Sequence, residues 1–277
     1  MKQIYNRAPL PFQGQKRHFA TVFETVLKQH FSDVKIVVDM FGGSGLLSHV
    51  ARRALPHATV IYNDYDDYHG RIDNIGHTNA LLASLREILK DCPRRAIVKE
   101  PYKSAILERF RAEEKRVGYV DYITMSSSLL FSGKYMTCYD TFARETWYNS
   151  IIMSEYFAGG YLDGIDIVKM DYRDLYSRYH RCPDVLFVTD PPYLCTDVST
   201  YNCLYWKIAD YLNVLDTIRE TSCIYFTSSK SAILDLCQWI EARTGYGNPF
   251  ADASVIEHRA IVNSNANYIE KMLYRRR

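Results

Sequence analysis

The sequence lacks the features that mark a secreted, membrane-spanning or zinc-binding protein. Its N-terminus has no apolar segment of the kind found in signal peptides, and no apolar run is long enough to span a bilayer. Its seven cysteines form no Cys-x-x-Cys pair and no Cys/His spacing typical of a zinc site. We therefore expect a cytoplasmic protein with no membrane partner and no metal, whose cysteines are reduced residues of the core.

A strong excess of charge is also missing. The net charge is +2 and the isoelectric point is near 8.1, so a polyanionic partner would have to be bound by local patches rather than by the field of the whole protein. Tyrosine, in contrast, is frequent, with 23 residues. Its ring and polar tip suit a nucleic-acid surface, but they suit other interfaces equally well, so composition leaves the partner open.

The order of apolar segments predicts an α/β fold. A length of 277 residues accommodates one α/β domain with a sizeable insertion, or two modest domains. Strand-like runs alternate with amphipathic stretches, which predicts a mostly parallel, doubly wound sheet. The expected strands are 34–38, 60–62, 165–170, 185–189 and 223–227, and the expected helices are 17–30, 46–54, 206–220 and 232–243. Two further β-like segments, 254–262 and 268–274, flank a turn-rich linker and predict a terminal antiparallel hairpin.

This pattern is interrupted in the middle of the chain. Long amphipathic segments at 81–89 and 104–115 predict a mainly helical inserted lobe at 76–160, between the parts 1–75 and 161–277 of one domain. Basic residues are frequent there: Arg86, Lys90, Arg94, Arg95, Lys99, Lys103, Arg109, Arg111, Lys115 and Arg116, partly offset by Glu108, Glu113 and Glu114. They form either a solvated helical face or a surface for nucleic-acid phosphates and base edges.

The strongest chemical signal is Asp190-Pro191-Pro192-Tyr193, which directly follows the expected strand 185–189. The carboxylate can accept a hydrogen bond from an amine. Pro191 has no N–H, so the segment offers carbonyl acceptors and little backbone freedom, while Tyr193 can stack on a planar ring. The four residues suit an aromatic ring that carries an amine, although a rigid strand-to-loop turn can have the same sequence.

A glycine-rich segment, Asp39-Met40-Phe41-Gly42-Gly43-Ser44-Gly45, follows the first expected strand. Glycines let the backbone approach a ligand and enter a helix whose N-terminus favours negative charge. The dinucleotide fingerprint requires Gly or Ala where Ser48 stands, so NAD and FAD are disfavoured and another nucleoside cofactor stays open. Asn63-Asp64, after the second strand, can place an acid at the hydroxyls of a ribose or can cap a helix.

Weaker signals lie elsewhere. The segment 11–16, Pro-Phe-Gln-Gly-Gln-Lys, offers a turn glycine and a lysine able to neutralise a carboxylate, but taken alone it is typical of a surface turn. Tyr201, Tyr205 and Trp206 are further pocket candidates, with core packing favoured for Trp206, and Lys230 is either a phosphate ligand or a surface lysine. His49 and His180 are expected to be helix residues and not catalysts.

Together, in this order, the motifs resemble those of amino-methylating DNA methyltransferases, in the adenine-specific group that includes the Dam methylases. Residues 11–16 resemble the Phe-x-Gly-x-Lys element of that group, and residues 39–45 resemble its Asp-x-Phe-x-Gly-x-Gly cofactor loop. Asn63-Asp64 is similar to its ribose-binding acid, Asp171-Tyr172 to the Asp-Phe step at the cofactor adenine, and residues 190–193 to its catalytic loop.

The resemblance implies a Rossmann-like methyltransferase fold that uses S-adenosylmethionine to methylate the N6 amine of a flipped adenine in double-stranded DNA, with the lobe 76–160 recognising the target. The catalytic residues that it implies are Asp190, Pro191, Pro192 and Tyr193. The cofactor-binding residues that it implies are Phe12, Gly14, Lys16, Asp39, Phe41, Gly42, Gly43, Gly45, Asp64, Asp171 and Tyr172. We expect a monomer, and a cognate restriction endonuclease of a restriction-modification system is a partner that the resemblance leaves open.

Some features depart from that group. Related adenine methylases often have Gly-Gly-Lys where this chain has Gly14-Gln15-Lys16. The insert looks helical rather than rich in β-hairpins, so no base-reading residue can be transferred to it. Methylation of RNA adenine, DNA cytosine or a protein glutamine, and a catalytically silent DNA-binding relative, stay open as alternatives.

Overall fold

The computed structural model describes residues 4–131, 133–194, 206–263 and 266–277. Contacts divide the chain into two compact units. The first, here called the sheet unit, comprises Met1–Arg7, Gln15–Asp66 and Gly160–Arg277, and the second, the helical unit, comprises Ala8–Gly14 and Asp67–Gly159. The helical unit thus begins nine residues before the predicted boundary at 76 and takes in a short N-terminal segment as well.

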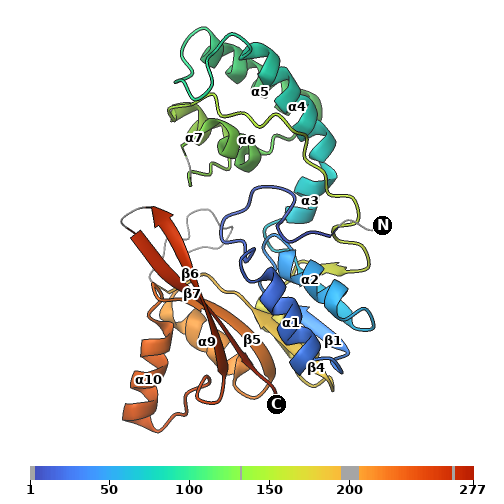
Figure 1. The fold of residues 1–277 in the computed structure, drawn as a ribbon, viewed down its shortest axis with the longest axis vertical. Helices are drawn as coiled ribbons and strands as arrows, with labels where there is room; N and C mark the ends of the chain where they lie inside the picture. Colours follow the sequence, from blue (N-terminus) through green and yellow to red (C-terminus); the bar gives the residue numbers. More distant parts are fainter. Residues whose placement is uncertain (1–3, 132, 195–205, 264–265) are drawn as a thin grey trace. The chain divides into compact units, whose positions relative to one another are not determined.

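The sheet unit is built on one seven-stranded sheet in the order β3-β2-β1-β4-β5-β7-β6 (Figure 1). The strands are β1 Ile36–Asp39, β2 Thr59–Asn63, β3 Asp166–Val168, β4 Val185–Thr189, β5 Ser222–Ser228, β6 Ser254–Asn263 and β7 Ala266–Arg275. Strands β1 to β5 pair in parallel, whereas β7 pairs antiparallel with both β5 and β6. The predicted Rossmann-like methyltransferase architecture, with its terminal antiparallel hairpin, is confirmed.

Helices cover both faces of this sheet. They are α1 Ala20–His30, α2 Leu46–Ala54, α8 Tyr172–Tyr179, α9 Ile208–Ile218 and α10 Ile233–Thr244. Alternate residues of β1 point to opposite faces, so Val37 packs with α1 and α2, while Val38 packs with α8, α9 and α10. Buried strands with both faces covered explain why β4 is a continuous apolar run in the sequence.

Helix α8 was not predicted from the sequence. It is only eight residues long and has no continuous apolar stripe, because just Tyr172 and Leu175 are buried. Its start is fixed by Asp171, whose side chain accepts a hydrogen bond from the amide of Arg173. A cap and two buried residues are too weak a periodic signal for prediction from sequence.

The helical unit has a hydrophobic core of its own. Its described helices are α3 Tyr68–Asp73, α4 Ile75–Ile88, α5 Tyr102–Val117, α6 Tyr122–Leu129 and α7 Tyr139–Arg144. Leu82, Phe110, Met125, Phe142 and Trp147 are among the buried residues that these helices and the following segment bring together. A separate core is what allows this stretch to form a compact body distinct from the sheet.

No helix in the described part of the chain is long and apolar enough to cross a membrane. The described residues also contain no group of three or more His, Cys, Asp or Glu side chains suited to a metal ion. Cys92, Cys223 and Cys237 are buried free thiols, as expected, but Cys182 is only partly buried and Cys138, which precedes α7, is exposed. Cys195 and Cys203 lie outside the described residues.

Candidate active site

Two neighbouring parallel strands, β1 and β4, end at the same edge of the sheet. Asp39 is the last residue of β1 and pairs in register with Val188, while Asp190 follows the last residue of β4. The chain leaves β1 for β2 on one side and leaves β4 for β5 on the other, so this edge is the topological switch point. In open α/β sheets, ligands bind in the crevice outside the strand ends at that point.

The glycine loop after β1 is shaped by Tyr62 of β2. A Cβ added to Gly42 would lie 2.2 Å from a ring carbon of Tyr62, so this position tolerates no side chain. The Tyr62 hydroxyl lies 2.7 Å from the Gly43 carbonyl oxygen and 3.0 Å from a carboxylate oxygen of Asp64. Gly45 has φ 70° and begins α2, a conformation that L side chains adopt at a cost. The loop is therefore a tight backbone cradle at a helix N-terminus.

Asp39 is only 1% exposed, and the Ser48 hydroxyl donates to its Oδ2 at 2.7 Å. Its Oδ1 makes no hydrogen bond within the described residues. Burial raises the pKa of Asp39 to about 7; the Ser48 hydrogen bond opposes this shift and the charge of Asp190 adds to it. Burial of a carboxylate with few hydrogen bonds disfavours its ionised form, which accounts for the direction of this shift.

Asn63, the last residue of β2, forms hydrogen bonds with the segments that follow β1 and β3. Its amide nitrogen donates to the carbonyl oxygens of Met40 at 2.9 Å and Met170 at 3.0 Å, and its side-chain oxygen accepts from the amide of Met170 at 3.0 Å. The neighbouring Asp64 is buried, and its amide donates to Val168 at 2.8 Å. The loops after β1 and β3 are thus held side by side next to the predicted ribose acid.

The predicted Asp171-Tyr172 pair has two different environments. The Asp171 carboxylate is engaged by its own helix, because it accepts from the amide of Arg173 at 2.8 Å and forms an ion pair with that guanidinium at 2.8 Å. The Arg173 hydrogen bond lowers the pKa of Asp171. Tyr172 instead packs with Phe41 and stacks on Trp206, with ring centroids 5.2 and 5.8 Å apart. Core packing of Trp206 is confirmed, and these rings form an aromatic wall beside the glycine loop.

Asp190 forms an ion pair with Lys16. The Lys16 Nζ lies 2.5 Å from the Asp190 Oδ2, with side chains 6% and 16% exposed. The same ammonium lies 5.3 Å from the ring centroid of Tyr193 and 5.9 Å from that of Phe226. Burial raises the pKa of Asp190, the Lys16 ammonium opposes this shift, and the charge of Glu270 adds to it. The structure thus brings Lys16 to the predicted catalytic carboxylate.

The other residues of the N-terminal element belong to the helical unit. The Phe12 ring packs edge-on against Tyr68, with centroids 5.7 Å apart. The Tyr68 hydroxyl accepts from the Leu10 amide at 2.9 Å and lies 3.1 Å from the Leu10 carbonyl oxygen. Gly14 has φ 77°, which explains the glycine. The motif is therefore divided, with Phe12 and Gly14 in one unit and Lys16 in the other.

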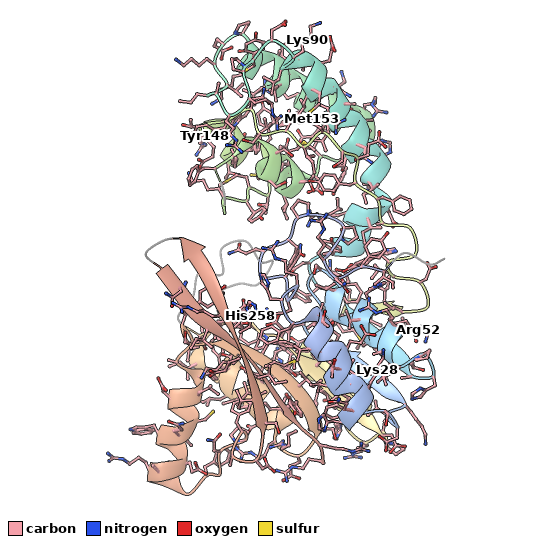
Figure 2. The ribbon with its side chains drawn as sticks, in the orientation of Figure 1. Lys28, Arg52, Lys90, Tyr148, Met153 and His258 are labelled. Atoms are coloured by element: carbon pink, nitrogen blue, oxygen red, sulfur yellow. The ribbon has the colours of Figure 1, made fainter. Side chains whose placement is uncertain are left out.

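One acidic residue near Asp190 was missed by the sequence analysis. Glu270 of β7 is paired in register with Ser228 of β5 and His258 of β6, the latter labelled in Figure 2. Tyr268 donates to its Oε1 at 3.2 Å, and its Oε2 makes no hydrogen bond within the described residues. Only strand register brings Glu270 to this edge, and the sequence contains no local signal for it.

The sequence analysis also named two histidines, Lys230 and two tyrosines, and the structure describes the first three of these residues. His49 lies in α2, as predicted, 2.6 Å from the Tyr161 carbonyl oxygen, whereas His180 is not a helix residue and directly follows the end of α8. The Lys230 Nζ lies over the Tyr268 ring at 4.3 Å. Tyr201 and Tyr205 lie outside the described residues.

Many basic side chains of the helical unit are engaged within that unit. Glu113 is buried and pairs with both Arg109 and Arg116 on the same helix. Lys90, labelled in Figure 2, pairs with Glu87. Internal hydrogen bonds or ring contacts also occupy Arg86, Arg94, Lys103 and Arg111. The frequency of basic residues in the sequence therefore overstates the charge that this unit offers to a phosphate backbone.

The sheet order, the glycine cradle and the Asp190 loop together define a Rossmann-like methyltransferase domain. No protein-family model matches the chain. It is 34% identical over 286 residues to a protein named "Putative methyltransferase" from Haemophilus influenzae, with 99% of this chain and 94% of that protein covered. The chain belongs to the same family, and it is a methyltransferase whose methyl donor is S-adenosylmethionine.

Among solved structures, a precorrin-6y C5,15-methyltransferase from Geobacter metallireducens GS-15 aligns with 95% of this chain and 89% of that chain. The two are 9% identical, and the TM-score is 0.34. That likeness is too weak to bear on the substrate of this chain.

Proposed function

We propose that this methyltransferase transfers the methyl group of S-adenosylmethionine to the N6 amine of an adenine in double-stranded DNA. The observation that carries the proposal is the Asp190-Pro191-Pro192-Tyr193 loop at the carboxyl end of β4, beside the glycine cradle that follows β1. The loop offers acceptors for an amine, and the cradle suits a nucleoside cofactor. Among the enzymes that the motifs resemble, Asp at the first position of this loop favours adenine as the methylated group over cytosine or a protein glutamine.

The acceptor chemistry accounts for the residue types. An adenine amine is a poor nucleophile because its lone pair is delocalised into the ring, and inside a duplex it cannot reach the cofactor, so the base must be flipped out at a cost of roughly a few kcal/mol. Asp190 and the Pro191 carbonyl would then accept both amine hydrogens. This favours a tetrahedral nitrogen and stabilises the positive charge that develops on it. Tyr193 would stack on the extruded ring.

The chain mainly supplies position and electrostatics. S-adenosylmethionine, when bound, supplies a methyl group on a sulfonium leaving group, so a direct in-line displacement suffices. Gly42 and Gly43 would let the backbone approach it, and Asp39, Phe41 and Asp64 would be among the residues that hold it. Asp190 need not be a strong base, because the amine proton becomes acidic only once the nitrogen is methylated.

We also propose that the helical unit recognises the target and that the protein acts as a monomer. Because many of its basic residues are engaged internally, we expect contacts to bases and sugars to contribute more there than phosphate neutralisation does. We therefore expect the affinity for DNA to depend only modestly on the salt concentration.

The test uses tritiated S-adenosylmethionine with unmethylated duplex DNA, single-stranded DNA and RNA as separate acceptors, followed by nucleoside chromatography. We expect label in N6-methyladenine from duplex DNA, and none with the Asp190→Ala variant. Label in RNA, in cytosine or in protein, with none in DNA adenine, would overturn the proposal. Single-molecule sequencing of DNA from cells that express the chain would then report the methylated base and its sequence context.

A further inference from the structure

We propose that Lys16 is a positioning residue for Asp190: its ammonium orients the carboxylate that receives the adenine amine and keeps it ionised, instead of binding the cofactor. The proposal rests on the role given to Asp190 under the proposed function. It assigns Lys16 to the methyl acceptor side of the site, although its sequence motif is associated with the cofactor.

The first support is the geometry of the ion pair. The Nζ of Lys16 is 2.5 Å from Asp190 Oδ2, and the lysine is almost fully shielded from water. The rings of Tyr193 and Phe226 lie 5.3 and 5.9 Å from that ammonium. An ion pair in such surroundings is screened far less than a surface pair, and a buried ammonium needs a counter-charge. Asp190 provides that counter-charge.

The second support is that the ion pair uses only one of the two carboxylate oxygens of Asp190. A carboxylate has two oxygens and about four lone-pair sites, so Oδ2 can hold the ammonium while Oδ1 accepts from an amine. Holding Oδ2 also fixes the plane of the carboxylate. The ion pair therefore prepares Asp190 for the amine and does not compete with it.

The third support is the charge around Asp190. Glu270 from β7 and Asp39 from β1 are the acids that interact electrostatically with it, and Tyr193 and Tyr225 are further titratable neighbours. Burial and Glu270 both raise the pKa of Asp190, whereas Lys16 lowers it. Without the ammonium, Asp190 would hold its proton at higher pH, and a protonated carboxyl loses one of its acceptor sites.

The experiment compares Lys16→Met and Lys16→Arg with the wild type, and uses Lys35→Met as the control, because Lys35 is an exposed lysine that pairs with Asp184 at the opposite end of β4. Calorimetry gives the affinity for S-adenosylmethionine, and initial rates on duplex DNA at saturating cofactor give kcat against pH. For Lys16→Met we expect kcat at pH 7 to fall about 100-fold. The acid limb of its pH profile should move up by about one pH unit, since a neighbouring cation shifts a carboxyl by that order.

The affinity of Lys16→Met for the cofactor should stay within about threefold of the wild type, because the lysine does not serve that ligand. Lys16→Arg keeps the charge and should retain the wild-type acid limb, and Lys35→Met should behave as the wild type. A tenfold weaker affinity with unchanged kcat would instead assign Lys16 to the cofactor. If kcat fell but the acid limb did not move, the positioning role would be wrong and Lys16 would only stabilise the fold.

A second measurement needs no DNA and so separates this proposal from the proposed function. Carbon-13 NMR follows the titration of the Asp190 carboxyl in the wild type and in Lys16→Gln, which also serves if Lys16→Met does not fold. A higher Asp190 pKa in the variant supports the positioning role even if no DNA is methylated. An unchanged pKa overturns that role even if DNA methylation is confirmed.

Discussion

Asp39 ends β1 and Asp190 directly follows the adjacent parallel strand β4, and the pKa of Asp39 is raised by burial and, to a smaller extent, by the charge on Asp190. Asp39 lies next to the glycine cradle, and Asp190 begins the loop 190–193. Lys16 pairs with Asp190 and not with Asp39 in the described contacts. The edge therefore combines a carboxylate that is paired with a cation and a buried carboxylate whose ionised form is disfavoured.

The proposed role of Asp190 predicts that Asp190→Ala lowers methyl transfer by at least about 100-fold, because the positive charge proposed to develop on the amine nitrogen would lose the carboxylate that stabilises it. Binding of S-adenosylmethionine should survive. The matched control is Asp184→Ala, at the opposite end of β4, where the exposed carboxylate pairs only with exposed Lys35 in the described contacts. That variant should keep wild-type activity, and near-wild-type activity of Asp190→Ala would contradict the assignment.

The raised pKa of Asp39 predicts that the stability of the protein depends on pH. Its pKa is about 7 in the folded protein, against an ordinary value of 3.8. As the pH rises, the unfolded chain therefore loses this proton at a lower pH than the folded protein does. The contribution of Asp39 to the free energy of unfolding should therefore fall between pH 4 and pH 7, by at most about 4 kcal/mol. Asp39→Asn removes this term and should gain stability relative to the wild type on going from pH 5 to pH 8.

Urea unfolding at the two pH values measures that difference. Asp166→Asn, at an exposed position of β3, is the control and should follow the pH dependence of the wild type. If Asp39→Asn also followed the wild type, burial would not be raising the pKa of Asp39.

The cradle predicts that Gly42→Ala is destabilising by about 1–3 kcal/mol, because the added Cβ meets the buried ring of Tyr62. It should also weaken binding of S-adenosylmethionine, since the loop must move away from the ring. Gly76→Ala in α4 is the matched control: a Cβ there meets nothing within 4 Å, and alanine should stabilise the helix by about 0.5–1 kcal/mol. Thermal melts and calorimetry check both variants.

In the helical unit, the buried Arg71 Nε lies 3.1 Å from Asp121 Oδ2, and Asp121 also caps α6 through the amide of Thr124. Arg71→Met leaves that carboxylate buried without its counter-charge and should lower the stability of this unit by about 3–5 kcal/mol. The double variant Arg71→Met/Asp121→Asn should lose less than the sum of the two single changes. An additive result would mean that the two side chains are not coupled.

Some of the site could be predicted because its signals are local. Buried parallel strands produce nearly continuous apolar runs such as 185–189, and a backbone cradle requires glycine at 42, so both are visible as patterns. Asp39 and Asp190 follow from those strands, because parallel strands end at one edge. Helix α8 escaped prediction since its signal is one cap and two buried side chains.

The sequence by itself therefore determined the alternation of strands and helices, the terminal hairpin and the chemical character of the two loops, because each depends on the conformational preferences and burial of neighbouring residues. Only the tertiary structure decided which charges meet. Lys16 reaches Asp190 across 174 positions, Glu270 comes to the same edge through strand register, and Glu113 pairs with two of the arginines that were candidates for phosphate contacts. Ion pairs depend on distance and shielding in space, and neither is encoded in the spacing of residues along the chain.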